Sequence, residues 1–218
     1  MNRLRFLALI MSLGASLTAA ASPVKVTHDI RSDGPSQVKA EGVMQASPEN
    51  VWKQVIRFND YDQFMPRVLE SFFISEDGLP ALQNAGTKNA NKLRSVAKKY
   101  KVSVPRKEGG KWEGLLFMVL DTPFPVENRW YVIRTTQDET KAARHIYKRC
   151  WELVAGNIES ATGCWAFEPG STPDETMSRY EDHADPGGKV PQWMTRLGAT
   201  QTIPEMFQRV EKLARTQE

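Results

Sequence analysis

The sequence has little of what most metal sites and covalent active sites require. Its 218 residues include two cysteines and three histidines, and His28, His145 and His183 do not have the spacing of metal ligands. We find no Cys-x-x-Cys pair, no glycine-rich phosphate loop and no serine nucleophile elbow. These absences leave no support for a metal site, a cofactor or covalent catalysis.

A strong charge imbalance is lacking as well. The formal net charge is +3, and removal of residues 1–21, which contain two basic and no acidic residues, would lower it to +1. Such a balance does not indicate a nucleic-acid partner. With 40% hydrophobic and 25% charged residues, the composition is typical of one globular domain.

The N-terminus predicts a secretory signal peptide over residues 1–21. Arg3 and Arg5 precede an apolar run over 6–17, and small residues end at Ala21. The run is shorter than the roughly 20 residues of a membrane span, so a membrane anchor is not expected. We predict export to the periplasm or secretion after cleavage near Ala21, followed by a lead-in segment, 22–36.

The mature chain begins with a strand and two short helices. Residues 37–45 have a strand pattern, and Ser47 is a helix N-cap before Pro48 and a helical apolar pattern. A short helical turn over 61–65 ends at a proline, and a strand is expected over 68–75.

Further along, the pattern becomes mostly β and ends in a helix. Aromatic and β-branched residues separated by turn residues predict an antiparallel meander, followed by a long C-terminal helix that Pro204 should interrupt. The predicted strands are 112–120, 129–137, 142–154, 161–169 and 175–184.

Between these parts, a basic amphipathic helix is expected in an insertion near 80–108. Its apolar face includes Leu93 and Ala97. Two interpretations stay open: a helix that covers the domain, or a lid that contacts an anionic membrane. The lysines that would make that contact are Lys92, Lys98, Lys99 and Lys101.

Four segments resemble a known superfamily. Residues 46–68, 122–132, 163–169 and 180–194 are similar to the START-like and polyketide-cyclase-like (SRPBCC) proteins, here in the form of an exported bacterial START domain over 37–216. The resemblance implies an α+β helix-grip fold, in which a curved antiparallel sheet wraps around the long C-terminal helix. Two short helices follow the first strand, and an apolar cavity lies between sheet and helix.

Strand alternation then predicts which side chains face this cavity. The same aromatic stripe is also compatible with ordinary core packing, and Lys148 is expected to face solvent. The predicted ligand-binding residues are Trp130, Val132, Arg134, Trp151, Leu153, Trp165, Phe167 and Tyr180 on the strands, and Trp193, Leu197 and Met206 on the final helix.

The segment around Pro123 and Pro125 fixes where the next strand begins, because proline restricts its own φ and the residue before it. Arg129 then lies at a strand end, where it either ties the strand to a loop or contacts the ligand. Arg134 is predicted to face the cavity and to pair with Asp182. A structural role in the turn before the last helix is expected for Asp185.

The two cysteines are expected to lie opposite each other. If strands 142–154 and 161–169 form a hairpin through 156–158, Cys150 and Cys164 are cross-strand neighbours on the outer face. A longer loop over 155–161 would separate them. Because an exported chain meets oxidising conditions, a disulfide between them is a further expectation.

Together these patterns favour a protein that binds, and transfers, a lipid or another hydrophobic small molecule. Two alternatives stay open. One is a cyclase or dehydratase for a polyketide-like substrate, with Arg134, Asp182 and Tyr180 as acid–base groups. The other is a non-catalytic assembly or regulatory factor with a filled cavity.

Overall fold

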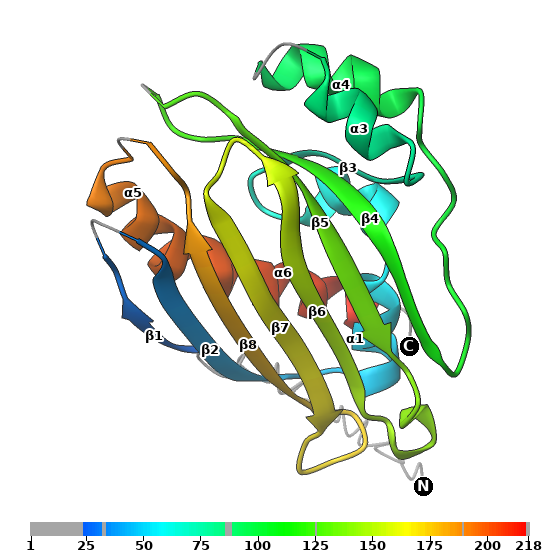
Figure 1. Ribbon diagram of the computed structural model, residues 1–218. Helices are drawn as coiled ribbons and strands as arrows, with labels where there is room; N and C mark the ends of the chain where they lie inside the picture. The colour runs from blue at the N-terminus through cyan, green and yellow to red at the C-terminus, as the bar shows by residue number, and fades with distance from the viewer. Residues whose placement is uncertain (1–23, 32–33, 86–88, 125, 189, 217–218) are drawn as a thin grey trace, which may run out of the picture.

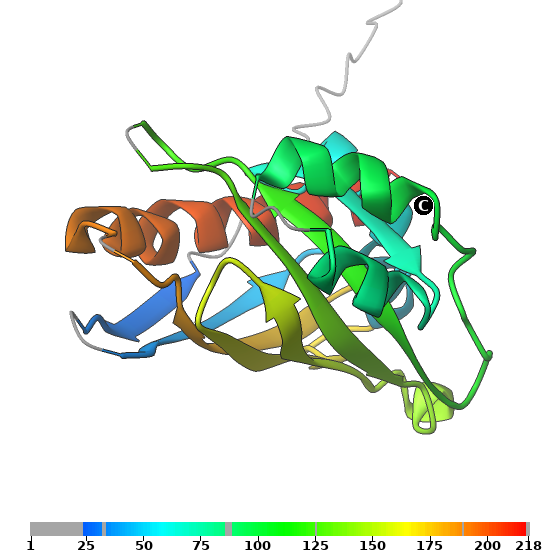
Figure 2. The ribbon, with the colours of Figure 1, turned by 45° about the horizontal axis from the view of Figure 1, so that its top comes forward.

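A computed structural model describes residues 24–31, 34–85, 89–124, 126–188 and 190–216, so the predicted signal peptide lies outside the described residues. Within them, eight strands form one antiparallel sheet in the order β1-β2-β8-β7-β6-β5-β4-β3. The sheet curves, and the C-terminal helix lies across its concave face (Figures 1 and 2). This is the predicted α+β helix-grip fold. The strands are β1 Lys25–Asp29, β2 Ser36–Met44, β3 Val68–Ile74, β4 Lys111–Leu120, β5 Arg129–Asp138, β6 Tyr147–Gly156, β7 Ser160–Pro169 and β8 Thr176–Asp185.

The helices follow the predicted order. Two short helices after β2 are confirmed, and the basic insertion contains two helices, α3 and α4. The helical elements are α1 Pro48–Val55, η1 Phe58–Asp60, α2 Tyr61–Phe64, α3 Gly78–Gln83, α4 Ala90–Lys98, η2 Ala142–Arg144, α5 Gln192–Leu197, η3 Gly198–Thr202 and α6 Ile203–Arg215. In the described part of the chain, none of these helices is both long and apolar enough to cross a membrane.

Strand β1 was not predicted. It lies inside the 22–36 lead-in and pairs antiparallel with β2 from Lys25↔Glu41 to Asp29↔Gln37. Its side chains are mostly exposed, so it lacks the alternation that identifies a half-buried strand. The pairing with β2, rather than its own sequence, makes it an edge strand.

The start of α1 shows the predicted cap. Ser47 has extended backbone angles and its Oγ accepts a hydrogen bond from the Asn50 backbone nitrogen, while Pro48 occupies the first helical turn. A serine cap satisfies an N–H that the helix itself cannot. The cap directs Trp52 into the concave side of the sheet, where it is almost fully buried.

One end of the grip is a filled core. The Trp52 ring stacks on Tyr147 at 5.3 Å between centroids and meets Phe167 edge-on at 6.0 Å. Phe207 of α6 closes the core from the other side, with its centroid 5.3 Å from that of Trp165. The packed rings of these side chains fill this end of the interior.

A second core lies on the convex face of the sheet. Leu93 and Ala97 of α4 are fully buried there, in one cluster with Phe117, Trp130 and Val132. Figure 1 shows α3 and α4 on the opposite side of the sheet from α6. The basic helix is thus a covering helix for strands β3 to β5.

This second core corrects three predictions. Trp130 and Val132 face α3 and α4, not the concave side. Arg134, on the same side of β5, pairs with Glu76 at 3.1 Å and Glu113 at 3.6 Å instead of with Asp182. Because β5 is buried on both faces, it carries bulky residues at both parities, and alternation alone does not identify the inner side.

The C-terminal helix is interrupted where Pro204 predicts a break. α5 and α6 are joined by the π-helical segment η3, and Pro204 lies in the first turn of α6. Proline has no N–H to donate to the preceding turn, and π-helical turns often occur at functional sites. Here the widened turn faces the interior of the grip.

The β6–β7 hairpin has the predicted register. Cys150 is paired with Cys164, and the two form a disulfide with their Cα atoms 4.0 Å apart. The ladder between the two strands ends at Glu152↔Thr162, so residues 153–161 are not paired across the hairpin, but the register is not shifted as a longer loop was expected to shift it. Both cysteines face outward, in agreement with the parity of Lys148.

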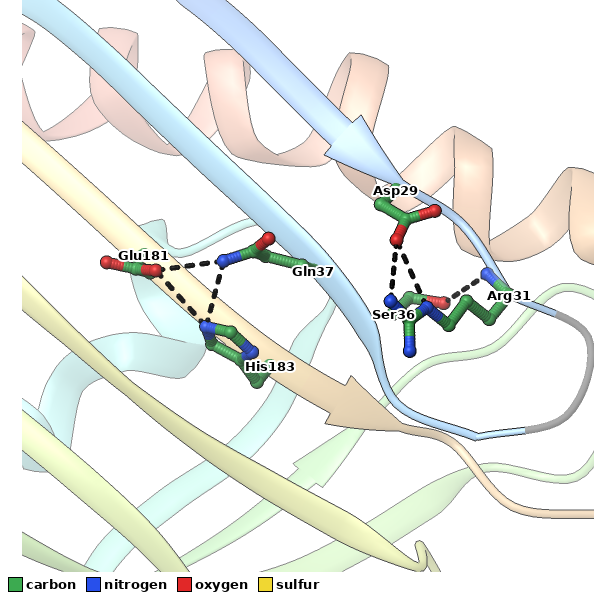
Figure 3. A network of polar contacts seen from close by, with 6 residues as sticks. All are labelled: Asp29, Arg31, Ser36, Gln37, Glu181 and His183. Carbon is green, nitrogen blue, oxygen red and sulfur yellow. Dashed lines mark hydrogen bonds and ion pairs between the residues drawn. The ribbon is translucent and has the colours of Figure 1, made fainter.

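The outer face of β2 and β8 carries a polar network. Gln37 Nε2 donates to Glu181 Oε1 at 3.0 Å and lies 3.2 Å from His183 Nε2. Figure 3 shows these three side chains on adjacent strands, together with a second group in which Arg31 bonds to Asp29 and Ser36. Since Glu181 and His183 face outward, the residue between them, Asp182, faces inward.

Candidate functional site

A cavity of about 400 Å3 lies between the concave face of the sheet and the α5–η3–α6 segment. It occupies the end of the grip that the Trp52 core does not fill. Its volume is within the range of small-molecule sites. The wall is mostly apolar, and its apolar residues include Val38, Met118, Leu120, Ile133, Trp165, Leu197, Ala199, Ile203 and Met206.

Several predicted ligand-binding residues meet in this cavity, and they come from both the sheet and the last helix. Those that line it are Trp151, Trp165, Tyr180, Leu197 and Met206. These positions follow the predicted alternation on β6, β7 and β8. Arg129 and Asp185, which were predicted to have structural roles, also lie in its wall.

Other predicted residues do not line it. Phe167 lies in the adjoining filled core, and Leu153, opposite Ile133 on the neighbouring strand, is not part of the cavity wall. Trp193 is 54% exposed on α5, so its predicted inward orientation is wrong. Trp193 and the cavity-lining Met194 are adjacent in the chain, but adjacent residues of a helix point in different directions. Trp193 therefore lies outside the helix face that packs on the sheet.

The lining residues that sequence reasoning missed include Tyr61, Tyr131, Ile133 and Arg149. The signal for Arg149 was present, because it shares parity with Trp151 on β6. On β5 the alternation was recognised, but Trp130 and Val132 were taken as the inward-facing residues. Tyr131 and Ile133 were therefore assigned to the outer side. Tyr61 arrives from α2, and its entry into the cavity depends on tertiary packing.

Arg149 is the charged side chain that is most deeply placed in the cavity wall, with 6% of its surface exposed. Its Nη1 donates to Tyr61 Oη at 3.0 Å and its Nε to Thr135 Oγ1 at 3.2 Å. The guanidinium carbon lies 4.8 Å from the ring centroid of Phe58, 5.6 Å from that of Tyr61 and 5.3 Å from that of Trp151. Aromatic faces at these distances attract a cation.

Asp182 of β8 adds a carboxyl group to the same wall. Its Oδ1 accepts a hydrogen bond from Trp151 Nε1 at 3.1 Å. Burial raises the pKa of Asp182 from 3.8 to about 6, and the Trp151 bond and the charge of His183 offset part of that rise. The carboxyl group therefore titrates near neutral pH.

Gly163 makes the contact between Trp151 and Asp182 possible. It lies on β7 between them, and a Cβ there would come within 2.4 Å of Trp151 Cζ2 and 2.3 Å of the Glu181 carbonyl oxygen. A larger residue would displace the indole ring. The glycine thus lets the ring cross β7 and donate to the next strand.

Two tyrosines add hydroxyl groups to the wall. Burial raises the pKa of both Tyr131 and Tyr180, with a smaller contribution from the nearby Asp182 carboxylate. They stay protonated at neutral pH and present hydroxyl groups to a ligand.

The open end of the cavity is built from loops. Arg129 Nη2 donates to the Gly187 carbonyl oxygen at 3.0 Å, and the Gly187 backbone nitrogen donates to Asp185 Oδ1 at 2.9 Å. Gly187 has a φ of 67°, which favours glycine. Arg129 thus ties β5 to the loop before α5, at the rim that also includes Pro123.

The described residues hold no group of three or more His, Cys, Asp or Glu side chains placed to bind a metal. What the cavity offers chemically is apolar surface, one buried cation, one carboxyl group that titrates near neutral pH and tyrosine hydroxyls.

A curved antiparallel sheet, a long helix across its concave face and an apolar cavity between them define the helix-grip class of binding folds. The chain belongs to the family described as "Polyketide cyclase / dehydrase and lipid transport", whose model matches residues 44–211. The predicted resemblance to the START-like superfamily is confirmed by this match. No curated protein matches the chain.

Solved structures share the fold. A STAR-related lipid transfer protein from Xanthomonas axonopodis is 21% identical, with a TM-score of 0.60, over 92% of this chain and 98% of that one. Human STARD10 is 12% identical, with a TM-score of 0.59, over 91% and 72%. The Zhui aromatase/cyclase from Streptomyces sp. R1128 is 10% identical, with a TM-score of 0.55, over 83% and 94%. At these identities the likeness concerns the fold alone.

Proposed function

We propose that the protein carries a lipid or another hydrophobic small molecule in its cavity and shields it from water during storage or transfer. The observation that supports this proposal is the cavity of about 400 Å3, lined mostly by apolar side chains, inside a fold whose other end is fully packed. An unfilled apolar space is costly for a protein, because its lining lacks packing partners. A bound apolar molecule would supply them.

The strength of such binding depends on the apolar area that is removed from water. Each 100 Å2 of buried apolar surface contributes about 2.5 kcal/mol, against several kcal/mol of lost translational and rotational freedom. The polar groups of the wall would select the head group.

A variant that fills the cavity tests the proposal. Ala199 lines the cavity from η3 and is 2% exposed, so Ala199→Phe should occupy ligand space. We expect the native protein to bind an apolar fluorescent probe and Ala199→Phe to lose that binding while it still melts cooperatively. Lys148→Ala, on the solvent face, is the matched control and should bind as the native protein does. Equal probe binding by Ala199→Phe and the native protein would refute the assignment of the site.

We also propose that the chain is exported and that residues 1–21 are removed near Ala21. The N-terminal pattern supports this, and so does the disulfide between Cys150 and Cys164, since disulfides persist in oxidising compartments. N-terminal sequencing of protein from the producing cells tests it. A mature chain that begins at Met1, with two free thiols, would contradict export.

Transfer requires contact with a membrane, and we propose two contact regions. Phe124 is 93% exposed and Trp193 is 54% exposed. Phe124 follows the cavity-lining Pro123 in the chain, and Trp193 precedes the cavity-lining Met194. Exposed aromatic side chains at the rim of an apolar cavity favour insertion into the membrane interface.

The second region is the basic face of α4 and of the residues that directly follow it. Among the described residues no α4 side chain lines the cavity, so we propose electrostatic attraction rather than a lid. Near an anionic surface each lysine contributes about 1 kcal/mol. Lys98 pairs with Glu70 at 3.2 Å, and Lys101 lies over the Phe72 ring. The proposed contact residues are Lys92, Lys98, Lys99 and Lys101.

Vesicle co-sedimentation separates the two regions. We expect Phe124→Ala with Trp193→Ala to weaken binding to neutral and anionic vesicles alike. Lys92→Ala with Lys99→Ala should weaken binding to anionic vesicles only, and at low salt most strongly. If the native protein does not sediment with any vesicle, the membrane proposal is wrong.

One observation favours a second candidate function, a cyclase or dehydratase. Asp182 has a pKa near 6 and lies in the cavity wall beside Tyr180, which suits a general acid or base near neutral pH. Conversion of a poly-β-keto thioester analogue that is lost in Asp182→Asn would support it. The third alternative, an assembly factor with a filled interior, does not agree with the open cavity.

A further inference from the structure

Arg149 is buried in the cavity wall without an anionic partner. Among the described residues no carboxylate forms an ion pair with it, whereas the partly exposed Arg134 and Arg94 each pair with glutamate. Moving a charge out of water is costly unless the charge is paired. The guanidinium of Arg149 is therefore an uncompensated positive charge inside the protein.

Its hydrogen-bond partners carry no negative charge. Tyr61 Oη accepts from Arg149 and donates its own proton to the Val55 carbonyl oxygen. Thr135 Oγ1 also accepts from Arg149 and donates to the Cys150 carbonyl oxygen at 3.1 Å. Both hydroxyl groups have committed their protons elsewhere, so they hold the guanidinium in place as neutral acceptors.

The remaining N–H groups of Arg149 are available to a ligand. A guanidinium has donors on three nitrogen atoms, and within the described part of the chain no protein acceptor bonds to Nη2. Phe58, Tyr61 and Trp151 contact the group by their rings and stop it from swinging away. Since Arg149 lines the cavity, this fixed fork faces the ligand space.

The position of Arg149 is at the inner end of that space. Its neighbour Thr135 lies further along β5 than Ile133 and Tyr131, while Arg129 begins the strand at the rim. A ligand that reaches Arg149 thus extends its remaining atoms past the apolar wall toward the rim.

We propose that the cavity selects amphiphiles with an oxyanion, a carboxylate or a phosphate, and that this group bonds to Arg149 at the inner end while the apolar part points to the rim. This inference rests on the proposed carrier function and names its ligand class. Guanidinium groups bind both oxyanions with two parallel hydrogen bonds. Asp182 also lines the cavity, but its Oδ1 accepts a hydrogen bond from Trp151 Nε1 at 3.1 Å, and among the described residues it forms no ion pair with Arg149.

Chain-matched probes test the proposal. Hexadecanoic acid, hexadecyl phosphate and hexadecanol share one apolar chain and differ in the head group, and their affinities for the full mature chain are compared by displacement of an apolar fluorescent probe. We expect at least one of the two anions to bind about tenfold or more tightly than the alcohol. The anion with the larger preference identifies the head group.

Two arginine variants locate the anion. Arg149→Met keeps the side-chain length and removes the charge, and it should bring the anion-to-alcohol preference close to one while the alcohol still binds. Arg129→Met removes the arginine at the rim and should keep the preference. A preference lost in Arg129→Met and kept in Arg149→Met would overturn the assignment.

The native protein alone also decides the question if Arg149→Met does not fold. Equal binding of all three probes overturns the anion proposal and leaves the carrier function standing. Failure of all three probes to bind overturns both.

Discussion

Replacing Asp182 with asparagine should change how the stability of the protein depends on pH. Burial raises the pKa of the Asp182 carboxyl group from 3.8 to about 6 in the folded state. The folded state thus holds this proton more tightly than the unfolded state does. The stability that the proton provides is fully present below pH 3.8 and is lost as the pH rises through 6.

The magnitude follows from the size of the shift. Two pKa units correspond to about 3 kcal/mol in the free energy of unfolding. Asp182→Asn keeps an oxygen that accepts from Trp151 Nε1 but has no charge to bury. The free energy of unfolding of the variant, minus that of the native protein, should therefore rise by up to about 3 kcal/mol between pH 4 and pH 7.5.

Urea unfolding at several pH values measures this difference. Glu181→Gln, one position along β8 and on the solvent face, is the control. Hydrogen bonds from His183 and Lys39 lower the pKa of Glu181. The free energy of unfolding of Glu181→Gln, minus that of the native protein, should therefore fall as the pH rises. The change should be smaller than for Asp182→Asn, because solvent screens the exposed group. If the Asp182→Asn difference does not vary with pH, the carboxyl group is not buried as described.

Three further predictions concern the scaffold. Leu93→Ala should lower the free energy of unfolding by about 2 to 5 kcal/mol, because Leu93 of α4 is fully buried against the sheet. A free energy of unfolding within about 0.5 kcal/mol of the native value, from chemical denaturation, would contradict the second core. Reduction of the Cys150–Cys164 disulfide, whose sequence separation is 14, should lower the free energy of unfolding by about 3 kcal/mol. Reductant should therefore lower the Tm of the native protein and leave unchanged the Tm of the double variant Cys150→Ser, Cys164→Ser. Ser47→Ala should cost about 1 kcal/mol through loss of the α1 cap, whereas Ser95→Ala on the exposed side of α4 should cost little; equal effects would argue against the cap.

Much of the fold could be predicted from sequence because its signals are local. Ser47 and Pro48 mark the start of α1, and the predicted register of β6 and β7, two strands that follow each other in the chain, places Cys150 opposite Cys164. Each of these features depends on residues that are close in the chain.

The facing of β5 could not be predicted in the same way. Trp130 and Tyr131 are both suited to burial, and the choice between them depends on α3 and α4, which cover the convex side. Alternation identifies an inner face only where the other face is polar. On β6 that condition holds for Lys148 and Glu152, and the prediction for Trp151 agrees with the cavity.

Part of the candidate site depends on contacts between distant segments. Arg149 is held by Tyr61 of α2 and Thr135 of β5; its parity with Trp151 indicates the inner side of β6, but no local pattern shows these partners. Trp193 shows the opposite error. It was assigned to the buried side because it belongs to the apolar face of the last helix, but it lies at the edge of that face and is exposed to solvent. Sequence patterns thus predicted the wall of the cavity better than its charged group.

Native mass spectrometry of the mature protein, purified from its own compartment, tests the central claim most directly. We expect a co-purifying hydrophobic molecule that leaves on denaturation, is recovered by solvent extraction and is absent from Ala199→Phe prepared in the same way. A native protein that carries no such molecule, and that takes up none from a total lipid extract, would contradict the proposed carrier function.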